Sequence, residues 1–240
     1  MRKTNDEKIV LKVGGSIIQN NRGEVHVDLV REYALMIKEL RKEGFDITAV
    51  IVGGGAVSKR FASYARKLGA SEGVCDVVGI QATRLNAYLF IAAIGDDAYQ
   101  VVPRTLNEVA QASATGKVIV VGGLQPGQST SAVAALVAER LRANKLINAT
   151  DVKGVFTSDP KRNPEAKIIP KMTTKELQDI ILSSAYVAGG YELFDLIALK
   201  VIERAGILLV VLDGRNTDNV RLAVKGEHVG TWVYPCPGGD

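Results

Sequence analysis

Hydrophobic and polar residues follow two different periods along this 240-residue chain. Short, almost wholly apolar runs, such as IVLKV at residues 9–13 and TAVIV at residues 48–52, are typical of strands buried on both faces of a sheet. Longer stretches repeat an apolar residue every three to four positions, as DLVREYALMIKELRKEG does at residues 28–44, and this is the spacing of an amphipathic helix. The pattern predicts strands separated by helices.

The expected elements alternate in type along most of the chain. Strands are expected at residues 9–13, 46–52, 99–102, 118–121, 146–149, 207–212 and 231–234. Helices are expected at residues 28–43, 56–68, about 76–93, from 106, and at 130–141, 174–183, 193–205 and 218–224. This alternation predicts an α/β protein whose mainly parallel sheet is covered by helices on both faces.

No linker, low-complexity segment or fixed-period repeat divides the chain. Residues 1–240 are therefore expected to form a single domain. The Gly-, Asp- and Pro-rich stretch from Thr150 to Pro170 is the best boundary between two lobes of that domain.

Composition narrows the class of protein. Hydrophobic residues make up 47% of the chain, and we expect no apolar run long enough to cross a bilayer. The charged stretch MRKTNDEK leads directly into a strand-like run without the apolar core of a secretory signal, so we expect a soluble, cytoplasmic protein without membrane association. A net charge of +4 spread along the chain and 5% aromatic residues disfavour nucleic-acid binding.

Cysteine and histidine are scarce. Cys75 and Cys236 are far apart in the sequence, and they are expected to be free thiols rather than a disulfide. His26 and His228 are isolated, so neither a zinc-type cluster nor a Ser-His-Asp arrangement is indicated. Redox chemistry and histidine-based catalysis are disfavoured.

The stretch GGLQPGQS at residues 122–129 matches the phosphate-binding pattern G-x-x-x-x-G-K-[ST] except that Gln128 replaces the lysine. It lies between a predicted strand and a predicted helix. A helix N-terminus offers free N–H groups and a positive dipole end, and glycines let the backbone approach an oxyanion closely. The stretch therefore suits anion binding if a lysine comes from elsewhere.

Glycine pairs follow three of the predicted strands, at residues 14–15, 53–55 and 122–123. One such pair is usually only a tight turn, but loops at the carboxyl ends of parallel strands lie on one edge of a sheet, where ligands bind. Lys12 lies two residues before Gly14, so its side chain points to the same side of the strand and can supply the missing charge. The alternative is a strand lysine whose end snorkels to solvent.

Four stretches occur in a characteristic order. They are DVVGIQATRLNA at 76–87, GGLQPGQSTSAVAALVAE at 122–139, NATDVKGVFTSDP at 148–160 and AGGYELFDLIALK at 188–200. The first is similar to the D-x-x-G-[MI]-x-A-T-x-x-N-A stretch of uridylate (UMP) kinases, and the second to the GG-x-x-PG-x-[ST]-T stretch of their archaeal members. The third resembles an ATP-binding segment, and the fourth has Asp195 and Lys200 in matching places. Over nearly its full length the chain resembles the amino acid kinase family, and within it the archaeal type of uridylate kinase.

The resemblance implies a three-layer αβα sandwich of the amino acid kinase-like type. It also implies ATP-dependent phosphorylation of UMP to UDP, with Mg²⁺ carried mainly by the ATP phosphates, as part of pyrimidine nucleotide biosynthesis. Residues of about 1–145 would form the acceptor (UMP) half and those of about 146–240 the ATP-binding half. The implied assembly is a homohexamer built from dimers.

The same resemblance implies roles for individual residues. Those expected to bind UMP are Gly54, Asp76, Leu124, Gln125, Pro126, Gly127, Gln128, Ser129 and Thr130. Those expected to bind ATP are Lys12, Val13, Gly14, Gly15, Ser16, Gly55, Lys59, Thr150, Asp151, Phe156 and Asp159. The expected catalytic residues are Lys12, Lys59 and Arg60, and no protein ligand for a metal is expected.

The chain departs from the family at four places. Lys59 stands where an arginine is common and Arg60 follows it, so either can contact phosphate. Ser131 replaces a common aspartate, Phe156 a common tyrosine and Asp151 a common asparagine. None of these changes removes a group that phosphoryl transfer requires.

Other interpretations of these residues stay open at the level of sequence. Asp76 is as well explained by capping a helix, and Asp159 by a turn before Pro160. The alternative functions are a kinase for another small phosphate, of the isopentenyl phosphate or carbamate type, and a non-enzymatic protein that stores nucleotide or oxyanion.

Overall fold

The computed structural model describes residues 7–158, 163, 165–185 and 194–236. In this part of the chain a seven-stranded sheet runs in the order β3-β2-β1-β4-β6-β7-β5. All its pairs are parallel except the pair of β6 with β7. The strands are β1 Lys8–Val13, β2 Asp46–Val52, β3 Ile119–Val121, β4 Lys145–Thr150, β5 Lys171–Thr173, β6 Leu208–Asp213 and β7 Thr231–Tyr234.

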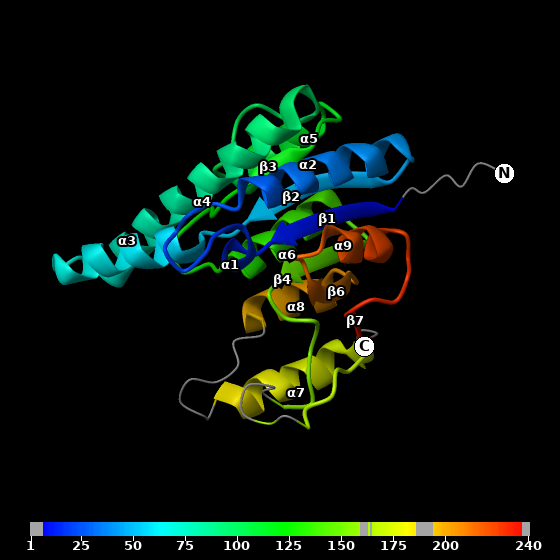
Figure 1. Ribbon diagram of the computed structural model, residues 1–240. Helices are drawn as coiled ribbons and strands as arrows, with labels where there is room; N and C mark the ends of the chain where they lie inside the picture. Colours follow the sequence, from blue (N-terminus) through cyan, green and yellow to red (C-terminus); the bar gives the residue numbers. More distant parts are fainter. Residues whose placement is uncertain (1–6, 159–162, 164, 186–193, 237–240) are drawn as a thin grey trace.

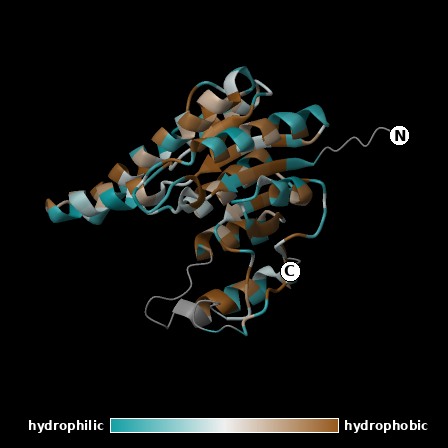
Figure 2. Ribbon diagram, viewed as in Figure 1, coloured by the Kyte–Doolittle hydropathy of each residue, from teal (hydrophilic) through white to brown (hydrophobic). Residues whose placement is uncertain are grey.

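Helices cover both faces of this sheet, which gives the expected αβα sandwich (Figure 1). One face packs against α1 (Gly15–Ile18), α2 (Val27–Lys42), α4 (Glu72–Ile94) and α9 (Thr217–Val224). The opposite face packs against α5 (Leu106–Ser113), α6 (Thr130–Leu141), α7 (Thr174–Ala185) and α8 (Leu196–Arg204). Figure 2 shows the hydrophobic strands between helices whose outer surfaces are hydrophilic.

The central strands are apolar on both faces because each face meets a helical layer. Along β1, Leu11 and Val13 belong to the core beneath α2 and α4, whereas Val10 belongs to the core beneath α6 and α8. Lys12 lies on the same face as Val10. It is therefore a charged residue on a face that the other strands fill mainly with apolar side chains.

Helix α3 (Gly55–Lys67) is built differently from the other long helices. It buries none of its residues, and it packs along the first part of α4, with which it projects from the body of the protein (Figure 1). By length and composition alone, the stretch Glu72–Asp97 could cross a membrane, which contradicts the expectation from sequence. In the fold this stretch is the core helix α4 with the short 3₁₀ turn η1 (Gly95–Asp97), and Phe90 and Ile94 are fully buried.

The sequence placed most elements correctly, but the strand expected at 99–102 is wrong. Only Ala98 forms a bridge there, with Val118. The Gln100 side chain donates to Gly95 O and Ala98 O, and Pro103 lacks an N–H group, so the ladder does not continue.

Short elements and some boundaries also differ from the expectation. The short elements α1, β5 and η1 were not expected, because runs of three or four residues carry little periodicity. Helix α4 begins four residues before the expected start, with Ser71 as its N-cap. Helix α8 begins after Asp195, and the expected start at 193 lies outside the described residues.

Candidate functional site

A cleft of about 790 Å³ opens where β1 and β2 end and α3, α4 and α6 begin. The three glycine loops that the sequence placed at one sheet edge meet here, as expected for parallel strands. Its lining includes Lys12, Gly14, Gly15, Ser16, Gly53, Gly54, Gly55, Lys59, Arg60, Asp76, Thr83, Gly123, Gln128, Ser129 and Thr130.

The loops after β1 and β2 touch through their backbones. A Cβ atom on Gly15 would collide with the backbone nitrogen of Gly55, and a Cβ on Gly53 with the nitrogen of Gly15. Gly55 also has φ +63°, a left-handed conformation that favours glycine. These glycines are therefore required by the contact between the loops, and their N–H groups remain close to the cleft.

A chain of buried amides holds the Gly53–Gly55 loop in place. Val57 N donates to Gln19 Oε1 (3.3 Å), Gln19 Nε2 donates to Asn86 Oδ1 (2.9 Å), and Asn86 Nδ2 donates to Gly53 O (2.8 Å). Gln19 and Asn86 are almost completely buried. The chain connects α1, α4 and the first turn of α3, and no motif signalled the role of Gln19.

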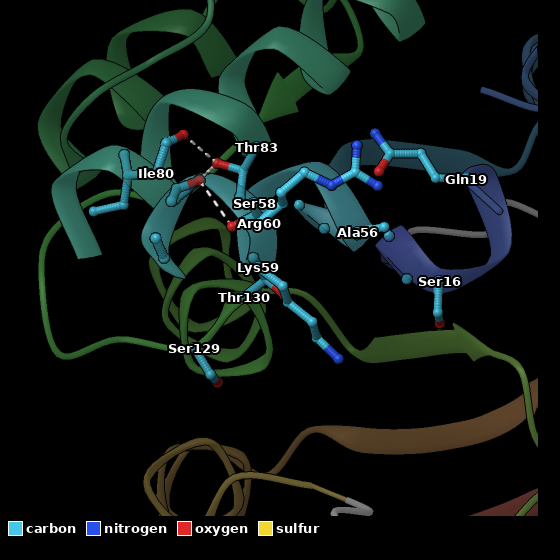
Figure 3. A pocket seen from close by; sticks show the side chains of 18 of the residues that line it. Ser16, Gln19, Ala56, Ser58, Lys59, Arg60, Ile80, Thr83, Ser129 and Thr130 are labelled. Atoms are coloured by element: carbon cyan, nitrogen blue, oxygen red, sulfur yellow. Dashed lines mark hydrogen bonds between the residues drawn. The ribbon is translucent and has the colours of Figure 1, made fainter. Parts of the chain in front are cut away.

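Lys59 and Arg60 leave the second turn of α3 in different directions (Figure 3). The Arg60 guanidinium donates to Arg22 O at 2.9 Å and to Asn21 O at 3.5 Å, in the loop before α2. Within the described residues, Lys59 has no hydrogen bond or ion pair through its ammonium group. Of the two cations, Lys59 is thus the one that is available to an anion in the cleft.

The loop after β3 is fastened to α4 at three points. Gly123 N donates to Thr83 Oγ1 (2.6 Å), Arg84 donates to Gly123 O (3.2 Å) and Leu124 O (3.3 Å), and Gly127 N donates to Asp76 Oδ2 (2.8 Å). Asp76 lies in the second turn of α4, so the alternative role as its N-cap is wrong. The loop forms a pre-shaped wall of the cleft.

Two helix N-termini meet beside this wall. Ser129 caps α6, accepting from Ala132 N at 3.0 Å, and its hydroxyl donates to Asp195 Oδ2 at 2.6 Å. Asp195 in turn caps α8, accepting from Ile197 N at 2.7 Å. The hydrogen bond between Ser129 and Asp195 joins the expected acceptor half to the expected ATP-binding half of the chain.

Lys12 is the most perturbed cation of the cleft. Burial lowers the pKa of its ammonium to about 8, although the nearby Asp151 carboxylate acts in the opposite direction. Within the described residues, the Lys12 ammonium has no hydrogen bond or ion pair. An anion entering the cleft would be its natural partner.

The structure separates some of the expected site residues from this cleft. Val13 is fully buried in the core beneath α2, so only its backbone faces the loop. Thr150 ends β4, Asp151 and Phe156 follow it, and all three lie outside the lining of the cleft. Asp159 lies outside the described residues.

Part of the expected acceptor wall also faces away from the cleft. Leu124 and Gln125 line a second cavity of about 220 Å³ beside α5, and Gln128 borders both cavities. Pro126 and Gly127 line neither. Lys200, on α8, is exposed and lines neither cavity.

Comparisons with known proteins give a consistent result. The sequence model of the amino acid kinase family matches residues 7–213. A uridylate kinase of Methanobrevibacter smithii is 41% identical over 226 residues, which are 94% of this chain and 98% of that protein. One of Methanothermobacter thermautotrophicus is 42% identical over 228 residues, which are 95% of this chain and 99% of that protein.

Solved structures agree with this match. The crystal structure of a uridylate kinase from Archaeoglobus fulgidus superposes with a TM-score of 0.83 and 39% identity, over 94% of this chain and 99% of that one. A UMP kinase from Bacillus anthracis, at 20% identity, covers 96% of this chain and 97% of its own with a TM-score of 0.78. At this lower identity, the match to the Bacillus anthracis protein shows only that the two chains share a fold.

Proposed function

This chain belongs to the amino acid kinase family, and from that premise we propose that it transfers the γ-phosphoryl group of ATP to UMP, giving UDP and ADP. Relatives at about 40% identity that match it almost end to end are uridylate kinases. The observation in the structure that carries the proposal is the cleft where three glycine loops meet two lysines, Lys12 and Lys59. Such a cleft suits the phosphate of UMP beside the triphosphate of ATP.

We assign the acceptor to the α4 side of the cleft. Gly54 would approach the UMP phosphate, and the wall of residues 124–130 would hold the nucleoside through backbone groups and the hydroxyls of Ser129 and Thr130. One carboxylate oxygen of Asp76 accepts a hydrogen bond from Gly127 N, and the other would accept a hydrogen bond from a ribose hydroxyl. The expected binding role of Asp76 is therefore compatible with its role in the loop.

We assign the ATP phosphates to the loop of residues 12–16, to Gly55 and to Lys59. Lys59 is preferred over Arg60 because the Arg60 guanidinium is already hydrogen-bonded to backbone carbonyls. Adenosine would lie beyond the end of β4, near Thr150, Asp151, Phe156 and Asp159. The acceptor half of about residues 1–145 and the ATP half of about residues 146–240 would then meet at the cleft.

The chemistry needs positioning and charge more than a base. A UMP phosphate oxygen attacks the γ-phosphorus in line, the bond from that phosphorus to the β,γ-bridging oxygen breaks, and ADP leaves. The second pKa of a phosphate monoester is near 6, so UMP is largely a dianion at neutral pH and has no proton to lose. Lys12 would stabilise the charge on the transferring and bridging oxygens.

Kinases of this kind use ATP with a divalent ion, and we infer that Mg²⁺ arrives on the ATP phosphates. Within the described residues, no three Asp, Glu, His or Cys side chains gather closely enough to hold a metal by themselves. A donor set made mainly of phosphate oxygens and water is what Mg²⁺ commonly accepts. The ion would neutralise phosphate charge, while the orientation of the phosphates falls to the glycine loops and lysines.

We further propose a homohexamer, placed in the cytoplasm and serving pyrimidine nucleotide biosynthesis. Exposed apolar side chains gather along α3 and α4 and would support contacts between copies of the chain. They are Phe61, Tyr64, Leu68, Val74, Val77, Leu85, Tyr88 and Leu89. Light scattering at several protein concentrations tests the assembly.

The proposed reaction is tested with a panel of phosphate acceptors, ATP and Mg²⁺, by measuring ADP release. UMP is expected to give the highest kcat/KM. Equal or better turnover of AMP or isopentenyl phosphate would contradict the assignment of the acceptor, and nucleotide binding without ADP release would indicate a storage protein.

A further inference from the structure

Asn148, in the middle of β4, is a polar residue in a position that suits an apolar one. Its side chain is only 2% exposed, and Leu146, Ile147 and Ala149 beside it are completely buried. Its Oδ1 atom is buried and accepts no hydrogen bond within the described part of the chain. A buried acceptor without a partner destabilises a fold, so this one calls for a functional reason.

A second buried asparagine shows the usual arrangement. Asn86 is 4% exposed, and its side-chain amide both accepts from Gln19 and donates to Gly53 O. Both of its polar ends are therefore satisfied. Asn148 is buried to a similar extent, but its side-chain oxygen has no hydrogen-bond donor within the described residues.

The sheet register places Asn148 beside Lys12. Lys12 on β1 pairs with Asn148 on β4, and the row continues to Ile51 on one side and Val211 on the other. Paired residues on parallel strands lie on the same face, about 4.8 Å apart. Ile51 and Val211 have no donor in their side chains, so Lys12 is the only side chain of this row that can donate to Asn148.

We propose that Asn148 is a positioning residue for Lys12, and that its amide oxygen accepts a hydrogen bond from the Lys12 ammonium. This inference rests on the proposed function, since it concerns the lysine assigned to the transferring phosphoryl group. Rotation of the flexible lysine stem brings the ammonium to an acceptor that is already desolvated. One of its three protons is then held by Asn148, and the others point to the phosphates.

Other charged groups around Lys12 do not replace this contact. Asp151 lies past the end of β4 and is exposed, and Lys59 on α3 carries the same charge as Lys12. Asp195, which caps α8, already accepts from Ser129 and Ile197 N. An uncharged acceptor also leaves the positive charge of Lys12 intact for the phosphates, whereas a carboxylate would partly neutralise it.

The test compares Asn148→Leu with Asn86→Leu as a matched control. Leu has the same branched arrangement of side-chain heavy atoms as Asn, so Asn148→Leu removes an unpaired acceptor and should keep or raise Tm, whereas Asn86→Leu leaves Gly53 O and Gln19 without partners and should lower it. If Asn148 positions Lys12, Asn148→Leu should still lower kcat about tenfold or more, with the KM for UMP nearly unchanged. Asn148→Asp, which keeps an acceptor, should recover part of that loss.

A second measurement does not depend on activity. The pKa of Lys12 is followed by NMR on protein labelled with ¹³C at lysine Cε, and the Lys12 signal is identified by its loss in Lys12→Arg. An acceptor stabilises the ammonium and raises its pKa, so the pKa should fall in Asn148→Leu and rise in Asn148→Asp.

The outcomes separate the two proposals. Wild-type kcat in Asn148→Leu together with an unchanged Lys12 pKa would overturn the positioning role, as would a lower Tm with full activity per folded molecule. A wild-type protein that does not phosphorylate UMP would contradict the proposed function, and the NMR titration would still decide whether Asn148 and Lys12 interact.

Discussion

The loop after β3 and the end of β1 face the same cleft, but their polar groups are arranged in opposite ways. The loop is fixed by Thr83, Arg84 and Asp76, whose hydrogen bonds already engage its backbone. At the end of β1, Lys12 is half-buried, its ammonium has no hydrogen bond or ion pair to any described residue, and its pKa is lowered. A satisfied network gives a rigid surface for recognition, whereas an unsatisfied charge is held ready for the phosphates.

The largest effect is expected from Lys12→Ala. It should lower kcat roughly a hundredfold or more, the scale of losing one preorganised donor to the transition state, while UMP binding hardly changes. Steady-state kinetics and calorimetry measure the two quantities. Near-normal kcat would show that Lys12 is only a strand residue.

Gln128→Lys in the Lys12→Ala background sharpens this result. It restores the phosphate-loop pattern at 122–129, but residue 128 borders the acceptor wall, so no rescue is expected. Rescue would mean that the acceptor and donor loops have been exchanged in our assignment.

Asp76→Ala should have the next largest effect, on the other side of the comparison. It removes the proposed ribose contact and the anchor of Gly127, and hydrogen bonds to a charged group contribute about 1.5–3 kcal/mol. We expect the KM for UMP to rise roughly tenfold while the KM for ATP stays nearly constant. A large fall in Tm with an unchanged KM for UMP would instead assign Asp76 a purely structural role.

The pH dependence distinguishes the unsatisfied lysine from the fixed loop. Because the ammonium form of Lys12 is the active one, kcat/KM should fall about tenfold for each pH unit well above the pKa of about 8 that Lys12 has in the protein without bound nucleotide. Folding lowers this pKa from 10.5, so the unfolded chain binds more protons between those values, and the contribution of Lys12 to stability should improve as pH rises through that window.

As pH rises from about 8 to 10, activity should therefore fall while the contribution of Lys12 to the free energy of unfolding increases. Rate profiles and denaturant unfolding at pH 7–10 measure them. Lys12→Met provides the control for stability, because it should lack this component of the pH dependence. A wild-type kcat/KM that stays constant up to pH 10 would exclude Lys12 as the titrating group.

Ser129→Ala should have the smallest effect, because Ser129 is only one of several residues that fix the loop after β3: it caps α6 and donates to Asp195. Loss of a helix cap costs about 0.5–2 kcal/mol, and Thr105→Ala, which removes the cap of α5, is the matched control. Both should lower the free energy of unfolding by similar amounts. Only Ser129→Ala loses the bond to Asp195, so it alone should raise the KM for UMP, by a few-fold.

The sequence predicted much of the fold because its strands and helices have clear periods. Residues that depend on local spacing, such as the glycines after β1, β2 and β3, were found in the same way. Asn148 was missed because its neighbour Lys12 is distant in sequence and close only through the register of β1 and β4. Gln19 was missed for a similar reason, since its partner Asn86 lies 67 positions away.

The choice between Lys59 and Arg60 likewise needed the tertiary structure. The two are adjacent in sequence and carry the same charge, but only Arg60 reaches the carbonyls of residues 21 and 22. Helix α4 starts after Ser71, upstream of the motif that drew attention to Asp76, and the Ser71 side chain makes no capping hydrogen bond. These details are set by contacts that no local pattern records.

The backbone contact between the loops after β1 and β2 bears on how this enzyme can be redesigned. Where main chain touches main chain, no side chain on the other loop can be trimmed to make room, so a substitution at Gly15 has no compensating partner. Gly15 and Gly53 should therefore be held constant in any library aimed at new acceptors. Diversity is better placed at Gln128, which borders the cleft and has a buried amide oxygen without a partner in the described chain.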